Sequence, residues 1–159
     1  SDLEAIDVLI CNAGVNLDRE TRLGAIDPAA WRQTFEVNTL APLMMAEAFV
    51  EHVARSKERK LVAISSRRGS IALNDGARYA YRASKTALNM EWKSLSRDTS
   101  GKGLICVVLH PGWVQTDMGG QAATLTIDQS VPAMVKVIDG LSPKDNGRFI
   151  NYDGTEIPW

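Results

Sequence analysis

The stretch IDVLIC, residues 6–11, is one of four short apolar segments that decide the fold of this chain. The other three are LVAIS at 61–65, LICVVL at 104–109 and RFINY at 148–152. The first three segments are almost continuous in Val, Ile and Leu, which is typical of strands buried on both faces. Strands of this kind form parallel sheets covered by helices, so we expect a parallel α/β sheet.

Helical patterns occupy the intervals between these segments. The first helix is expected to begin at Pro28 and to kink within 38–42, because Pro42 interrupts the helical hydrogen bonds. Two further helices are expected, at 79–97 and at 126–140. The alternation of strands and helices predicts crossovers that are all right-handed.

The size and composition of the chain predict one domain over residues 1–159. Lys and Arg number 18 and Asp and Glu number 19, so the net charge of −1 gives no reason to expect nucleic acid or an anionic membrane as a partner. No stretch approaches the ~20 apolar residues of a membrane span, and no residue group has metal-site spacing. Cys11 and Cys106 lie in apolar strands, which predicts reduced thiols and a cytoplasmic protein.

Polar and glycine-containing motifs follow the expected strands. Asn12-Ala13-Gly14 follows the first strand, a segment beginning at Ser66 follows the second, and residues 111–116 follow the third. The helix at 79–97 carries Tyr81 and Lys85, which are one turn apart on one face. Because ligands of parallel sheets bind at the carboxyl ends of the strands, these motifs predict one shared site.

Together the motifs resemble the short-chain dehydrogenase/reductase family, and in particular its C-factor-like carbonyl reductase branch. The matching segments are NAG at 12–14, Asn38, ISS at 64–66, YRASK at 81–85 and HPGWV at 110–114. The resemblance implies a Rossmann-like parallel sheet with flanking helices. It also implies NADP or NAD as cofactor and a small-molecule carbonyl or alcohol as substrate.

The resemblance assigns a role to each of four catalytic residues. Tyr81 is the acid/base, and a nearby Lys85 should favour its phenolate, since a free tyrosine has a pKa of ~10. Ser66 donates a hydrogen bond to the carbonyl oxygen, Lys85 binds the nicotinamide ribose, and Asn38 holds a water beside the lysine. The residues expected to line the cofactor are Asn12, Ala13, Gly14, Tyr81, Lys85, Pro111, Gly112, Val114 and Thr116.

The assignment of the serine leaves alternatives open. In the family the serine lies thirteen residues before the tyrosine, and Arg68 occupies that position here, whereas Ser66 lies fifteen before Tyr81. We therefore infer a two-residue insertion after Gly69. The rivals are Ser65 and Ser70.

Tyr79 is the rival for the tyrosine, because it lies thirteen residues after Ser66, but Ala83 and not a lysine follows it by four. A group of arginines nearby is expected to form a solvated face, with contacts to a phosphate or carboxylate as the alternative; these are Arg67, Arg68, Arg78 and Arg82. Residues 115–126 are expected to form a flexible lid.

The sequence lacks the glycine-rich turn that binds the cofactor's pyrophosphate in the family. We therefore expect either a fragment, truncated in its N-terminal half, or a naturally short relative, and the absence of an initiator Met favours the fragment. Two further hypotheses are a non-enzymatic, self-associating core and a subunit that completes its site with another chain.

Loss of the N-terminal strands predicts that the strand at 6–11 lies at a sheet edge, with no Lys or Pro to block pairing. One face of the sheet should also expose apolar side chains. We therefore expect a homo-oligomer, with the helices that carry Phe49 and Trp92 forming one contact.

Overall fold

The computed structural model describes residues 4–159, so the first three residues of the expected domain lie outside it. Its centre is a four-stranded sheet in the order β1-β2-β3-β4, and every neighbouring pair is parallel. The strands are β1 (Val8–Cys11), β2 (Lys60–Ile64), β3 (Ile105–His110) and β4 (Phe149–Asn151). The predicted parallel α/β sheet is confirmed, and β1 lies at an edge of the described sheet.

Four α-helices connect the strands, namely α1 (Pro28–Phe35), α2 (Ala41–Arg55), α3 (Tyr79–Asp98) and α4 (Ile127–Asp139). Short 3-10 turns lie at Arg67–Gly69, Ser100–Lys102 and Pro143–Asp145. A π-helical turn, Glu36–Leu40, joins α1 to α2 at the place where the sequence predicts a kink. The predicted capping box is present at the start of α4, where the backbone N–H of Gln129 donates to Thr126 Oγ1 at 3.2 Å.

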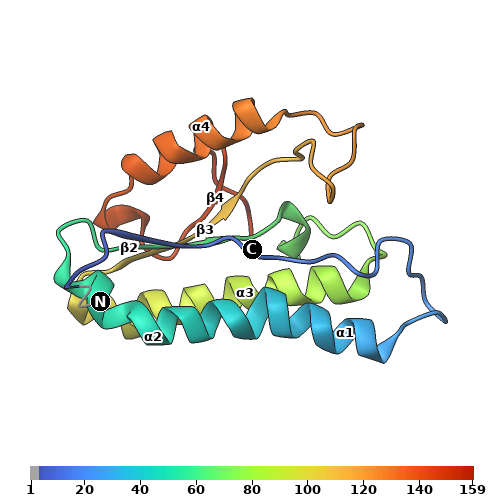
Figure 1. Ribbon diagram of the computed structural model, residues 1–159, viewed down its shortest axis with the longest axis horizontal. Coiled ribbons are helices and arrows are strands. Elements are labelled where there is room, and N and C mark those ends of the chain that lie inside the picture. Colours follow the sequence, from blue (N-terminus) through green and yellow to red (C-terminus); the bar gives the residue numbers. More distant parts are fainter. Residues whose placement is uncertain (1–3) are drawn as a thin grey trace.

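The helices cover both faces of the sheet (Figure 1). On one face, α2 and α3 contribute Val53, Leu88 and Trp92 to a buried cluster. On the other face, α4 contributes Ile138 to a second cluster. Alternate strand residues point into the two clusters, with Leu61, Ala63, Cys106 and Val108 in the first and Val62, Val107, Leu109 and Ile150 in the second.

The three crossovers do not share one hand. The β1-to-β2 and β2-to-β3 connections step the same way along the sheet and place their helices on one face. The β3-to-β4 connection steps the same way but places α4 on the opposite face, so its hand is opposite (Figure 1). The prediction of uniformly right-handed crossovers is therefore wrong. The long loop at 111–126 precedes α4 and carries the chain to the opposite face of the sheet. Short connections between parallel strands are almost always right-handed.

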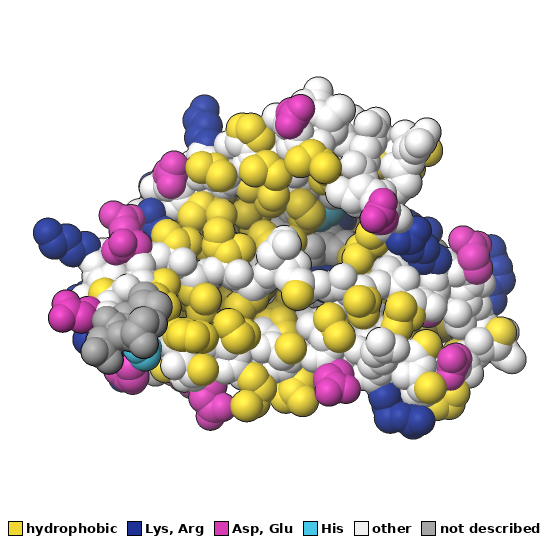
Figure 2. All heavy atoms as spheres, viewed as in Figure 1, with side chains coloured by type: hydrophobic (Ala, Val, Ile, Leu, Met, Phe, Trp, Pro, Cys, Tyr) yellow, Lys and Arg dark blue, Asp and Glu magenta, His cyan; other side chains and the backbone are white. Residues whose placement is uncertain are grey.

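Part of the apolar surface remains open to solvent. The expected bare face is partly covered, because α4 packs on it, but Ile10 of β1 is 46% exposed, and Val131 and Val135 of α4 are also exposed. Figure 2 shows hydrophobic side chains gathered between α4 and the edge of the sheet. Trp92 is 1% exposed and belongs to the core, so any contact made by the helices that carry Phe49 and Trp92 would involve other side chains of these helices.

Candidate active site

The first two turns of α3 carry Tyr81 and Lys85 to the carboxyl end of β2. Both side chains are buried, at 8% and 4% exposure. The turn after β2 packs directly on this helix, because a Cβ at Gly69 would lie 2.9 Å from the backbone carbonyl carbon of Lys85. Glycine at this position therefore lets the segment that begins at Ser66 approach the tyrosine and the lysine.

Ser66 is the serine that the structure places against Tyr81. Its side chain lies close enough to the Tyr81 phenol to lower the pKa of that group, and its oxygen accepts from the N–H of Arg68 at 3.1 Å. The two rival serines are bonded elsewhere: Ser65 donates to Asn89 Oδ1 and Ser70 to the carbonyl oxygen of Pro158, each at 2.6 Å. The geometry therefore favours Ser66 over both rivals.

The acidity of the pair differs from the sequence-based prediction. Burial raises the pKa of Tyr81, and the groups that oppose this effect are Ser66 and three arginines rather than Lys85. Burial also lowers the pKa of Lys85 to about 8, and its Nζ donates to the carbonyl oxygen of Ile64 at 2.9 Å. Burial is therefore the largest cause of the pKa shift of each residue, and the expected effect of Lys85 on Tyr81 is not among the causes.

Asn38 lies in the π-helical turn and is fully buried. Its Oδ1 accepts from the N–H of Val15 at 2.8 Å, and its Nδ2 donates to the carbonyl oxygen of Val15 at 2.8 Å and to Ser84 Oγ at 3.0 Å. A Cβ at Gly14 would lie 3.4 Å from both Asn38 Oδ1 and Lys85 Nζ. Asn38 therefore fixes the loop after β1 against α3, beside the lysine.

The loop after β3 is closed by its own hydrogen bonds. The N–H of Gln115 donates to the carbonyl oxygen of Leu125 at 2.8 Å, and Val114 forms an isolated parallel bridge with the same leucine. Gly112 has a φ of 83°, and a Cβ there would lie 2.4 Å from the Leu125 side chain. Thr116 Oγ1 accepts from the N–H of Gly119 at 3.0 Å.

Pro111 of this loop accepts a hydrogen bond from Ser130 Oγ at 2.7 Å. Within residues 4–159, no hydrogen bond joins residues 111–116 to Tyr81 or Lys85. The structure thus brings Gly14, Asn38, Ser66, Tyr81 and Lys85 together. The loop after β3 is held by its own hydrogen bonds and by Ser130.

Asp18 is a residue that the sequence analysis missed. It is 5% exposed, and its carboxylate accepts from the N–H of Ala80 at 2.7 Å and of Tyr81 at 3.2 Å. The local N-cap of α3, Arg78, has a left-handed backbone and offers no side-chain bond. Asp18 thus caps the helix from a distance of about sixty positions in the sequence, and it satisfies N–H groups that a helix start leaves unpaired. One signal in the sequence could have indicated a distant cap: no capping residue stands directly before Tyr79.

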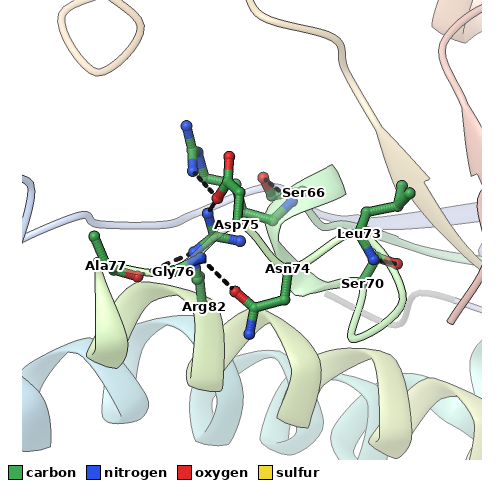
Figure 3. A network of polar contacts seen from close by, with 9 residues as sticks. Ser66, Ser70, Leu73, Asn74, Asp75, Gly76, Ala77 and Arg82 are labelled. Carbon is green, nitrogen blue, oxygen red and sulfur yellow. Dashed lines mark hydrogen bonds and ion pairs between the residues drawn. The ribbon is translucent and has the colours of Figure 1, made fainter.

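Arg82 organises the turn that precedes α3 (Figure 3). Its Nε donates to the carbonyl oxygen of Ala77 at 3.0 Å, and its guanidinium forms an ion pair with Asp75, which also pairs with Arg68 at 3.3 Å. Ala77 and Arg78 have φ values of 55° and 53°, a region that residues other than glycine rarely occupy. Arg82 is 7% exposed, so the prediction that it belongs to a solvated face is wrong.

The site fits one end of a nicotinamide cofactor. Asn12 and Ala13 are exposed at the end of β1, and Gly14 leaves space beside the Lys85 ammonium, which is a suitable donor to ribose hydroxyls. The sequence holds no glycine-rich turn for the pyrophosphate. Among residues 4–159, no cluster of His, Cys, Asp and Glu could hold a metal ion, and no helix is long and apolar enough to cross a membrane.

Comparisons with known proteins agree with this arrangement. The family model for short chain dehydrogenases matches residues 1–125. The protein named C-signal from Myxococcus xanthus is 49% identical over 155 residues, which cover 97% of this chain and 93% of that protein.

Two solved structures of carbonyl reductases are also similar. The carbonyl reductase Sniffer of D. melanogaster has a TM-score of 0.93 and 40% identity, over 99% of this chain and 68% of that one. The NADPH-bound carbonyl reductase from chicken fatty liver has a TM-score of 0.89 and 35% identity, over 98% of this chain and 67% of that one. The predicted resemblance in sequence and fold is confirmed.

Proposed function

Because this chain belongs to the short-chain dehydrogenase family, we propose that it carries the catalytic residues of an NAD(P)-dependent carbonyl reductase or alcohol dehydrogenase. The observation that supports this most strongly is the contact of Ser66 with Tyr81, one helical turn from the buried Lys85. A polar cluster of this kind is costly to bury without a function, because its groups must be desolvated.

We assign each residue one role in the reaction. In the direction of reduction, the cofactor supplies the hydride when bound. Ser66 donates a hydrogen bond to the carbonyl oxygen, and Tyr81 passes its hydroxyl proton to that oxygen as the negative charge develops. Lys85 then returns a proton to the phenolate, which its pKa of about 8 permits near neutral pH. Asn38 holds the loop after β1 in place beside Lys85.

Cofactor contacts are proposed for the residues that line the carboxyl ends of β1 and β3, namely Asn12, Ala13, Gly14, Pro111, Gly112, Val114 and Thr116. NADP is the preferred candidate, because the relative from chicken is described as NADPH-bound. A cytoplasmic location is proposed as well, since both cysteines are buried and free.

Substitution of Tyr81 by Phe tests this proposal. We expect the reduction of a simple aldehyde, measured by NADPH absorbance at millimolar cofactor, to fall by about 10²–10⁴-fold, since the phenol is the proposed proton donor. The matched control is Tyr79→Phe, which removes a hydroxyl two residues away and should leave the rate unchanged. Equal rates for Tyr81→Phe and the unsubstituted chain would remove Tyr81 from the mechanism.

A second candidate function is a non-enzymatic core that associates with itself. The name of the relative C-signal favours it, because that name describes a signal and not a reaction. Turnover of an aldehyde at millimolar NADPH, rather than binding affinity, separates the two candidates, because only the enzyme should oxidise the cofactor.

A further inference from the structure

Three segments bring arginines to the residues proposed as catalytic. Arg68 follows Ser66 closely, and its own N–H donates to the Ser66 hydroxyl at 3.1 Å. Arg78 is the residue at the start of α3, three positions before Tyr81. Arg19 follows Asp18, whose carboxylate accepts from the N–H of Tyr81.

These arginines are poorly matched by carboxylates. Asp75 already pairs with both Arg68 and Arg82. Both oxygens of Asp18 accept from backbone N–H groups of α3. Arg19 donates to a carbonyl oxygen, that of Asp117, at 3.0 Å. The arginines near Tyr81 therefore outnumber the carboxylates that pair with them, and Figure 2 shows Lys and Arg side chains beside the central hollow, with an acidic side chain next to them.

Of these arginines, Arg78 is the cation best placed to accept an added anion. Arg78 is half-buried, and it takes part in no ion pair within residues 4–159. The positive charge also reaches the reacting group, because Arg68, Arg78 and Arg19 lower the pKa of Tyr81 against the effect of burial. Burial and the neighbouring Arg78 lower the pKa of Arg68, as expected for guanidinium groups held close together.

We propose that the alcohol or carbonyl substrate of this site carries a carboxylate or a phosphate, which binds the guanidinium groups beside Tyr81. This inference rests on the proposed function. Guanidinium groups pair with both anions through two parallel hydrogen bonds, so the same arginines could hold either. A neutral substrate would leave this charge uncompensated, whereas an anion would bind and orient its reacting carbon toward Tyr81.

The test compares alcohols that differ in charge. Ligand-observed NMR, without cofactor, measures the binding of 4-(hydroxymethyl)benzoate, 4-(hydroxymethyl)phenyl phosphate and the neutral methyl 4-(hydroxymethyl)benzoate. Alcohols are used because an aldehyde can form an imine with a lysine. We expect at least one anion to bind about tenfold or more tightly than the ester, as a charge-assisted hydrogen bond implies. The stronger anion identifies which of the two groups the site prefers.

Variants locate the effect. Arg78→Gln should reduce the preference for the anion, while the control Arg97→Gln, an exposed arginine in the last turn of the same helix, should not. Equal binding of acid and ester, no binding of any probe, or an effect of Arg97→Gln equal to that of Arg78→Gln would overturn the inference. Oxidation of the three alcohols with NADP tests the proposed function separately: anion-selective binding without any turnover would contradict the enzyme and retain the charge preference.

Discussion

Tyr81 and Lys85 owe their acid–base properties to burial more than to each other. The spacing of the pair along the sequence predicts that both residues lie on one helical face. It does not predict that Nζ of Lys85 turns to the carbonyl oxygen of Ile64, nor that arginines from other segments oppose the rise in the pKa of Tyr81. Residue types and spacing could thus be predicted, but desolvation and long-range charge depend on the whole fold.

Glu91 shows the same effect away from the site. Burial raises its pKa to about 7, and its Oε2 has no hydrogen-bond partner. It lies at the edge of a hollow lined by the apolar side chains of Trp31, Phe35 and Leu40. Because the folded state holds this proton more tightly than the unfolded chain, stability should fall as the pH rises from about 4.5 to about 7.

We expect Glu91→Gln to remove this loss of stability. The variant should melt at a higher temperature than the unsubstituted chain at a pH above 7, where the carboxylate is charged, and at a similar temperature below pH 4.5. Thermal unfolding followed by circular dichroism across this range is the measurement. Glu47→Gln, an exposed glutamate on α2, is the control. An equal gain at both ends of the pH range would show that the charge of Glu91 has no role.

At the scale of elements, the bounds of α3 were predictable but its N-terminal cap was not. The apolar stripe predicts a helix over 79–97, and the structure has Tyr79–Asp98. The cap, however, comes from Asp18, which lies in another segment, and no local pattern contains it. The kink at Pro42 was likewise predicted by position, whereas its form, a π-helical turn that buries Asn38, follows from the packing of that turn against α3.

We expect Asp18→Ala to loosen the start of α3. The loss of a capping side chain costs about 1 kcal/mol, and two buried N–H groups would lose their acceptor. The amides of Ala80 and Tyr81 should exchange with solvent faster, as measured by NMR. Asp18→Asn keeps one acceptor oxygen and should restore part of the protection.

The matched control for this prediction is Asp27→Ala. Asp27 caps α1 by accepting from the N–H of Ala29 at 2.8 Å, and it is exposed. Its loss should speed exchange at the start of α1 and leave Ala80 and Tyr81 unchanged. If both variants affected α3 equally, general destabilisation and not capping would be the cause.

For the whole molecule, hydrophobic patterns predicted the parallel sheet, because continuous apolar strands require cover on both faces. The edge at β1 was predicted from the resemblance to the family and not from these patterns. The hand of the last crossover escaped prediction, since the loop at 111–126 carries no pattern that decides which face α4 covers. The apolar stripe of the helix at 79–97 did indicate its buried face, because Tyr81, Leu88 and Trp92 of that stripe are all buried.

We expect the 159-residue chain to bind NAD(P) weakly or not at all. Most of the affinity of dinucleotide sites comes from phosphate groups bound by backbone N–H groups at a helix start, and the sequence has no such turn. Calorimetric titration with NADPH and NADH is the measurement. A micromolar dissociation constant would reveal phosphate contacts that the sequence does not suggest.

A homo-oligomer is the remaining expectation for the whole molecule. Exposed apolar side chains occur in two places: on the helices, with Leu40, Met44 and Met90, and along β1 and α4, with Ile10 and Val131. Exposed apolar side chains of this kind favour an interface, and the edge of β1 in the described sheet offers backbone hydrogen bonds as well. Light scattering at micromolar concentration should therefore give a mass above 17.4 kDa.

Substitutions by lysine can show which of the two surfaces forms the contact between chains. Met44→Lys should reduce the mass if the helix face forms the contact, and Ile10→Lys should reduce it if the edge does, because a buried unpaired charge is costly at an interface. Ile71→Lys, at an exposed position on neither surface, is the control. If the unsubstituted chain is a monomer, the expectation of a homo-oligomer is wrong, and the apolar side chains along β1 and α2 remain exposed to solvent. An oligomer unaffected by either substitution would place the contact elsewhere.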